Sequence, residues 1–287
     1  MSPGCILVVA LGAAVLAPQA PVSWSPLVPL EGSIVRIRAD TAHTGELAGE
    51  PLHFLPDSAG GYTAIAAVPL GSPDTAPLIL RRGTGALTFR GIPVERRPSG
   101  PAVRLRTAPE FTRPPDSALL ARLRQERELV AAVLRNTHQR PRLWAGTFAA
   151  PRPGPIRSPF GASRGFSDGG EESRHRGADL AGKRGDPVRA ANRGVVALVA
   201  DLFYAGTVIY VDHGAGLITA YAHLSRALVA PGDTVTRGQV IGNVGASGRV
   251  TGPHLHWTAL YGRVAFDPVD LLQLGRPGPL GPKGLEG

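Results

Sequence analysis

The chain has 287 residues, of which 43% are hydrophobic and 18% charged, a balance that can bury a core and excludes a fibrous or disordered protein. Its 37 glycines and 28 prolines have no collagen-like period and favour many turns and short strands, so we expect a mainly β fold. The formal net charge of +9 is carried by arginine, because Lys183 and Lys283 are the only lysines.

That positive charge favours a polyanionic partner such as nucleic acid, anionic lipid or cell-wall polymer, although an arginine bias of the genome explains it equally well. The sequence contains neither the glycine-flanked aromatic pattern of RNA-binding sheets nor a helix-turn-helix signal. We therefore expect no nucleic-acid partner.

Residues 1–20 are predicted to be a signal peptide. An apolar run from Cys5 to Ala17 precedes Pro18-Gln19-Ala20-Pro21, a length and an ending typical of a secretory signal. The run is too short to span a bilayer. It also lacks a basic n-region, which leaves three alternatives: the segment is cleaved, it is retained as an anchor, or the true start of the protein lies at another position. We expect export to the periplasm or cell envelope, or secretion, with no stable membrane span after cleavage.

The single cysteine, Cys5, lies inside this apolar run. A mature chain without it has no internal disulfide and no thiolate for catalysis or metal binding. Any metal ion must therefore be held by histidine and carboxylate side chains.

The rest of the chain divides into four predicted segments. Residues 25–98 contain short alternating runs between Gly, Pro and Asp turns and predict a small β-sandwich, read as a spacer or substrate-positioning accessory domain. Residues 115–137 predict one connecting helix, with Ser117 as its N-cap. Residues 156–272 predict a second β domain, and residues 275–287 a flexible tail rich in Gly and Pro.

The second β domain contains a weak internal repeat. Gly185-Asp186-Pro187-Val188 leads into one valine-rich strand, and Gly232-Asp233-Thr234-Val235 leads into another. Two related hairpin units, swapped around a common core, explain this echo.

Five of the eight histidines gather in the second β domain, which favours a metal or catalytic site. His254 and His256 are separated by one residue, so on a strand both rings project from the same face while Leu255 and Trp257 point to the other. Such a pair is weak evidence by itself, although the Gly and Pro before it and the apolar opposite face strengthen it.

His175 and Asp179 offer a nitrogen and a carboxylate four residues apart, both of which zinc accepts. The alternative for this pair is a surface ion pair with the neighbouring arginines. His223 is predicted at the end of an apolar strand, and it is a candidate site residue whose alternative is a structural, hydrogen-bonded role. His213 is predicted to lie in a turn and to have a structural role.

These elements, HxxxD, AHLS and GPHLHW in that order, resemble the lysostaphin-type zinc metallopeptidases, family twenty-three of the metallopeptidases. The resemblance runs from Ser158-Pro159-Phe160-Gly161 to Asp267-Pro268, and the upstream sandwich and helix resemble, more loosely, the accessory region of some exported members. The loop between Phe160 and His175 departs from the family pattern in its richness in Gly, Ser and acidic residues.

The resemblance implies a duplicated antiparallel β fold crossed by a groove, and it implies roles for five residues. His175, Asp179 and His256 would hold Zn²⁺, while His254 and His223 would be catalytic. Three protein ligands leave a fourth position for water, His254 would be the base, and His223 would orient the water or stabilise the oxyanion.

The resulting hypothesis is a zinc metalloendopeptidase that hydrolyses peptide bonds of bacterial peptidoglycan, in stem peptides or cross-links. The alternative is a non-enzymatic scaffold that binds the wall or activates an amidase, which the intact ligand set argues against. A biotinyl or lipoyl carrier is a third reading, but Lys183 precedes its hairpin and Lys283 lies in the tail, so neither lysine is at a hairpin tip. The sequence identifies no regulatory partner.

Overall fold

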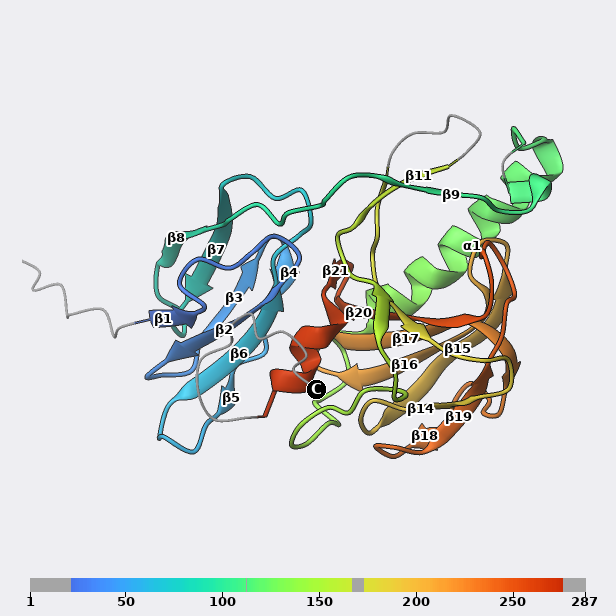
Figure 1. Ribbon diagram of the computed structural model, residues 1–287. Coiled ribbons are helices and arrows are strands. Elements are labelled where there is room, and N and C mark those ends of the chain that lie inside the picture. The colour runs from blue at the N-terminus through green and yellow to red at the C-terminus, as the bar shows by residue number, and fades with distance from the viewer. Residues whose placement is uncertain (1–21, 112, 167–172, 276–287) are drawn as a thin grey trace, which may run out of the picture.

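The computed structural model describes residues 22–111, 113–166 and 173–275 (Figure 1). The predicted signal peptide lies outside these residues, and so does the predicted tail apart from Gly275. Among the helices in the described ranges, none combines the length and apolarity needed to cross a membrane.

The N-terminal part is a sandwich of two antiparallel sheets, each with four strands in the described residues. The first sheet contains, in spatial order, β1 (Val22–Ser25), β2 (Ile34–Ala39), β6 (Tyr62–Ala67) and β5 (Leu55–Pro56). The second contains β4 (Glu50–Pro51), β3 (Thr44–Leu47), β7 (Thr75–Arg81) and β8 (Leu87–Pro93). Alternate residues of β2 and β7, such as Ile37 and Leu78, are fully buried, because successive side chains of a strand point to opposite faces.

A short 3₁₀ helix, η1 (Pro109–Phe111), precedes the helix α1 (Ser117–Asn136). The prediction that Ser117 is the N-cap is wrong by one residue, because the side chain of Asp116 accepts the N–H of Leu119 at 2.8 Å. A carboxylate at this position also complements the helix dipole. The helix rests on the second β domain, where Glu126 accepts the N–H of Phe203 at 2.9 Å and Val130 packs against a small apolar cluster.

The C-terminal part is built on a large antiparallel sheet, which has ten strands among the described residues. Its main path contains β10 (Ile156–Ser158), β13 (Ala178–Ala181), β20 (His254–Tyr261), β17 (Leu217–Ala227), β16 (Gly206–Gly214), β15 (Gly194–Leu202) and β18 (Thr234–Val235). Beside this path lie β14 (Pro187–Arg189), β19 (Val240–Val244) and β21 (Val264–Phe266), and the short helix η2 (Pro268–Gln273) ends the domain.

The internal repeat is visible as two turns of the same geometry. Gly185 and Gly232 have φ values of +93° and +94°, which glycine adopts without strain. Asp186 accepts the N–H of Lys183 and Asp233 that of Ala230, both at 2.8 Å. The two units exchange strands, because β14 of the first pairs with β19 of the second and β18 of the second pairs with β15 of the first.

A third small sheet joins segments that are distant in sequence. In it β9 (Val103–Leu105) pairs in parallel with β11 (Ser163–Phe166), which pairs antiparallel with β12 (Ser173–Arg174). Sequence analysis predicts no strand in the Pro- and Arg-rich stretch that contains β9. Its pairing depends on a partner about 60 residues away in sequence and not on local alternation.

The prediction of a mainly β protein with antiparallel sheets and one main helix is confirmed. The sandwich and the C-terminal domain share one continuous apolar core. Partly buried polar contacts reinforce this junction. Arg97 pairs with Asp267 at 3.1 Å, and Asp270 accepts the N–H of Ile34 at 3.0 Å.

Candidate metal centre

The strand β20 carries two of the predicted site residues and lies between β13 and β17. His254 and His256 point to the same face, while Leu255 and Trp257 on the other face are buried to 0% and 1% exposure. In the sheet register His256 lies opposite Asp179 of β13 on one side and Ala222 of β17 on the other. Cross-strand pairing therefore places a carboxylate directly beside an imidazole.

Three donor atoms converge at this point. The Nδ1 of His256 lies 2.8 Å from Oδ1 of Asp179, and the Nε2 of His175 lies 3.0 Å from that Nδ1 and 3.2 Å from that Oδ1. Within the described residues these three form the group whose ligand atoms could share a metal ion. The sequence offered an ion pair with a neighbouring arginine as the alternative for Asp179. Arg174 pairs with Glu31 instead, at 3.0 Å, and the arginine that pairs with Asp179 is Arg164.

The hydrogen bonds around the cluster show that these residues fit a cation. The Nδ1 of His175 is 3.0 Å from the carbonyl oxygen of Pro159, which can only accept, so the proton sits on Nδ1 and Nε2 presents a lone pair. His256 can place its own proton on Nε2, 2.9 Å from the hydroxyl of Thr258. Two imidazole lone pairs and a carboxylate oxygen then face one point, which is the donor set of a zinc site with an open position.

The electrostatics of the cluster keep these groups in their ligating forms. Burial lowers the pKa of His175 and therefore favours its neutral ring. Burial alone would raise the pKa of Asp179, but its hydrogen bonds to His175 and His256 outweigh this and hold the pKa well below its usual range. The site thus combines a neutral imidazole at His175 with an ionised carboxylate at Asp179.

His254 and His223 lie beside this cluster, with ring centroids 5.0 Å apart. The Nδ1 of His254 donates to the carbonyl of Gly252 at 2.8 Å, and the Nδ1 of His223 to that of Ser247 at 2.9 Å. Each ring therefore holds a proton on Nδ1, so Nε2 is the nitrogen that can accept a proton or a hydrogen bond. Burial lowers the pKa of His223 to about 3, so this ring is neutral at ordinary pH.

The backbone also adapts to the site. His223 has a φ of +62°, which is unusual for a residue with a side chain, and it lies at a register shift in the pairing of β17 with β16. At Gly177 a Cβ would come within 2.8 Å of Nε2 of His256 and 2.6 Å of the carbonyl oxygen of Trp257. Glycine is required there because the chain between His175 and Asp179 passes directly over the ring of His256.

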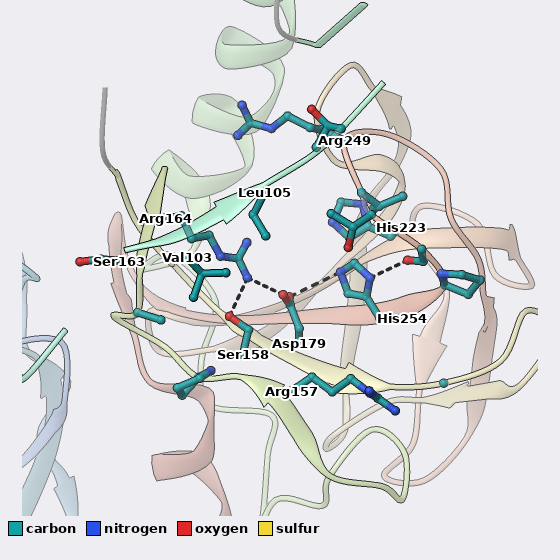
Figure 2. Close-up of a pocket in the computed structure, with 18 residues that line it drawn as sticks. Val103, Leu105, Arg157, Ser158, Ser163, Arg164, Asp179, His223, Arg249 and His254 are labelled. Carbon is teal, nitrogen blue, oxygen red and sulfur yellow. Dashed lines mark hydrogen bonds and ion pairs between the residues drawn. The ribbon is translucent and has the colours of Figure 1, made fainter. Parts of the chain in front are cut away.

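Sequence reasoning missed Arg164, a residue of β11 that contacts the cluster. Its guanidinium binds Oδ2 of Asp179 and lies 2.9 Å from the hydroxyl of Ser158. Figure 2 shows Arg164 and His254 on opposite sides of Asp179. The loop composition before His175 gave no signal for this contact, since it depends on the pairing of β11 with β9 and β12.

A cavity of about 450 Å³ opens beside the cluster and is lined by Asp179, His223 and His254. Val103 and Leu105 of β9 form part of its wall, as Figure 2 shows. A segment predicted only as a connection between domains therefore borders the site. A peptide that filled this cavity beside His223, His254 and Asp179 would contact this strand.

The remaining histidines lie outside the cluster. His213 is fully buried at the end of β16, not in a turn, and its nitrogens contact the carbonyl of Arg193 and the hydroxyl of Thr219, both at 2.8 Å. His53 and His138 contact each other at 2.9 Å at the junction with the sandwich.

A two-histidine, one-carboxylate cluster with two further imidazoles beside it has the side chains of a metal-dependent hydrolase. The sequence profile of peptidase family M23 matches residues 173–268, the segment that contains all five of these residues. This part of the chain is a peptidase M23 domain, as the resemblance implied.

Two curated relatives and one solved structure illustrate the similarity. The chain is 41% identical over 99 residues to peptidoglycan DD-endopeptidase ShyC of Vibrio cholerae, covering 34% of this chain and 23% of the relative. It is 41% identical over 105 residues to the DD-carboxypeptidase/endopeptidase Mpg of Neisseria meningitidis, covering 37% of this chain and 24% of the relative. The chain thus spans about a quarter of the length of these relatives.

A crystal structure described as a peptidase M23 from Pseudomonas aeruginosa matches a larger part of the chain. It aligns with a TM-score of 0.67 and 29% identity over 84% of this chain and 93% of that one. Its similarity therefore extends beyond the M23 domain.

Proposed function

We propose that this protein is a zinc-dependent metalloendopeptidase that hydrolyses peptide bonds of bacterial peptidoglycan, in stem peptides or cross-links. The observation that carries the proposal is the convergence of His175, Asp179 and His256 within 3.2 Å of one another, with the bare Nε2 atoms of His254 and His223 beside them. The names of the relatives, which are peptidoglycan endopeptidases, support the substrate.

The proposal assigns a role to each residue of the site. His175, Asp179 and His256 hold Zn²⁺, and residues 156–272 form the peptidase domain. When bound, the ion supplies a Lewis acid that polarises the scissile carbonyl and lowers the pKa of water to about 7. Hydrolysis also needs a group that removes a proton from the attacking water, and this is the role of His254.

The tautomers of the two catalytic histidines divide the work between them. The Nε2 of His254 lies 3.6 Å from Oδ1 of Asp179, close to the ligand cluster, and can take the proton of the water and return it to the leaving amine. His223 is neutral and holds its proton on Nδ1, so its Nε2 accepts a hydrogen bond from the water. Of the two roles implied for His223, orientation of the water is therefore favoured over stabilisation of the oxyanion.

Peptidoglycan as substrate requires that the protein reach the periplasm or the outer face of the cell envelope. The apolar run that begins at Cys5 supports export, and the sandwich formed by β1 to β8 is proposed as an accessory module of the peptidase. A partner that regulates the site remains unassigned.

The test is mass spectrometry of purified peptidoglycan after incubation with the protein, with chelator, and with chelator followed by Zn²⁺. New peptide fragments that disappear with chelator and return with zinc are expected, and their masses identify the bond that is cut. If zinc is bound and no fragment appears, the proposal is wrong and a wall-binding or amidase-activating role replaces it. Glycan fragments in place of peptide fragments would also contradict it.

A further inference from the structure

A second hollow, of about 690 Å³, lies between the sandwich and the segment that follows α1, and it shares no lining residue with the metal centre. Its floor is the outer face of the first sheet. Arg36 and Arg38 of β2 alternate with buried residues and point away from the sandwich core, beside Ile65 and Thr63 of β6. The opposite side is formed by Arg142 and Trp144.

The lining carries an excess of positive charge. Three arginines face one carboxylate, Asp57, which pairs with Arg38 at 2.9 Å and whose pKa is lowered to about 2 by the backbone N–H of Gly61 and by that arginine. Burial lowers the pKa of His53, the histidine of this lining, and keeps it neutral. The lining therefore has two more positive than negative charges at neutral pH.

Arg36 and Arg142 differ in their exposure to solvent, but both present a guanidinium group that can bind a carboxylate. Arg36 is half-buried, and burial lowers its pKa, so its charge is held where water solvates it incompletely. Arg142 is exposed and lies over the ring of Trp144, 4.7 Å from its centroid, which orients the guanidinium. Planar guanidinium groups bind carboxylates through two parallel hydrogen bonds.

Apolar side chains share the lining with these charges. Leu55, Ile65 and Trp144 line the same hollow as the arginines. A bare inorganic anion would leave this surface uncovered, whereas a short peptide with carboxylates joined by aliphatic atoms would bury it.

We propose that this hollow is a second binding site, which takes a short peptide carrying two or more carboxylates. The assignment of that peptide to the stem peptides of the wall rests on the proposed function. Binding there would hold the protein on its polymeric substrate while the metal centre cuts at another place, in the manner of a bivalent attachment.

The binding test uses the full chain with His175→Ala, so that the probe is not cleaved and the metal centre is not loaded. The probe is the stem tetrapeptide alanyl-γ-glutamyl-diaminopimelyl-alanine, titrated by calorimetry, with the same peptide amidated on its carboxylates as the negative probe. Arg142→Gln is expected to raise the dissociation constant at least about tenfold and Arg142→Lys less, because lysine keeps the charge and loses the fork.

Arg237→Gln is the matched control, since Arg237 is exposed and lies outside the hollow. Equal binding by the Arg142→Gln protein, equal binding of the amidated peptide, or tighter binding of glycerol phosphate oligomers would overturn the proposal. A second variant, Arg36→Gln, checks the other wall, with its melting temperature measured to show that it is folded.

Activity measurements separate this proposal from the proposed function. In the otherwise native protein, Arg142→Gln should reduce release of fragments from intact peptidoglycan several-fold and leave hydrolysis of a short soluble peptide unchanged. If the native protein hydrolyses nothing, the proposed function fails while the calorimetric result still stands. If hydrolysis is normal and the variant binds the tetrapeptide as tightly as the control, the second site alone is rejected.

Discussion

The sandwich and the C-terminal domain are both antiparallel β structures with apolar interiors, yet they use buried polar side chains differently. In the C-terminal domain, the central strands β20 and β17 carry histidines that converge on one point with Asp179. In the sandwich, buried Glu31 and Glu50 reach across the junction to Arg174 at 3.0 Å and His138 at 3.0 Å. The comparison indicates that the buried carboxylates of the sandwich serve its junction with the C-terminal domain, whereas those of the large sheet contribute to the candidate metal centre.

The largest effect expected from this comparison is the loss of the metal centre. His175→Ala should abolish both zinc binding and peptidoglycan hydrolysis, because two ligands cannot replace three. His43→Ala, in the sandwich, is the control and should change neither. Metal analysis by mass spectrometry and the hydrolysis assay measure both, and stoichiometric zinc in the His175→Ala protein would refute the assigned ligand set.

His254→Ala separates catalysis from metal binding. Zinc content should stay at one per chain while the hydrolysis rate falls by about 10² to 10⁴, the usual contribution of a positioned base. Steady-state kinetics on a soluble peptide provide the rate. Unchanged turnover would move the role of base away from His254.

The junction between the two regions should depend on pH through Asp270. Burial and the nearby carboxylate of Asp267 raise the pKa of Asp270 to about 7, above its value in an unfolded chain. The contribution of Asp270 to the free energy of unfolding is therefore complete below about pH 4. It is lost as the pH rises through about 7, and the loss is at most about 4 kcal/mol.

Asp270→Asn should remove this dependence, because the amide oxygen can still accept the N–H of Ile34. Thermal unfolding between pH 4 and 8 should show the variant gaining stability over the native protein as pH rises. Asp201→Asn, at an exposed position of β15, is the control. Parallel stability curves for the native protein and Asp270→Asn would contradict the assignment.

The smallest expected effect concerns the residue that sequence reasoning missed. Arg164→Gln should weaken zinc binding about 10- to 100-fold, because the guanidinium orients the carboxylate of Asp179. Competition with a chelator of known affinity measures this change. Arg157→Gln lines the same cavity and should leave the affinity unaltered, so an equal loss in both variants would indicate a general charge effect.

Much of this architecture could be predicted from local patterns. Glycine and proline content with short alternating runs indicated a β fold, and the single residue between His254 and His256 indicated a shared strand face. The Gly-Asp repeat indicated two related units, whose turns have the same hydrogen bonds. These predictions succeeded because period-two alternation and turn chemistry are properties of neighbouring residues.

What local patterns could not decide are contacts between distant segments. The sequence by itself determined which side chains are available for metal chemistry, since a chain whose single cysteine is Cys5 must rely on histidine and carboxylate. Only the tertiary structure placed β9 at the edge of the cavity, Arg164 against Asp179, and Asp270 in a buried junction. These contacts depend on strand pairing and packing between segments that are distant in sequence. The degree of burial that results, and not residue type, sets which polar groups meet and how far their pKa values shift.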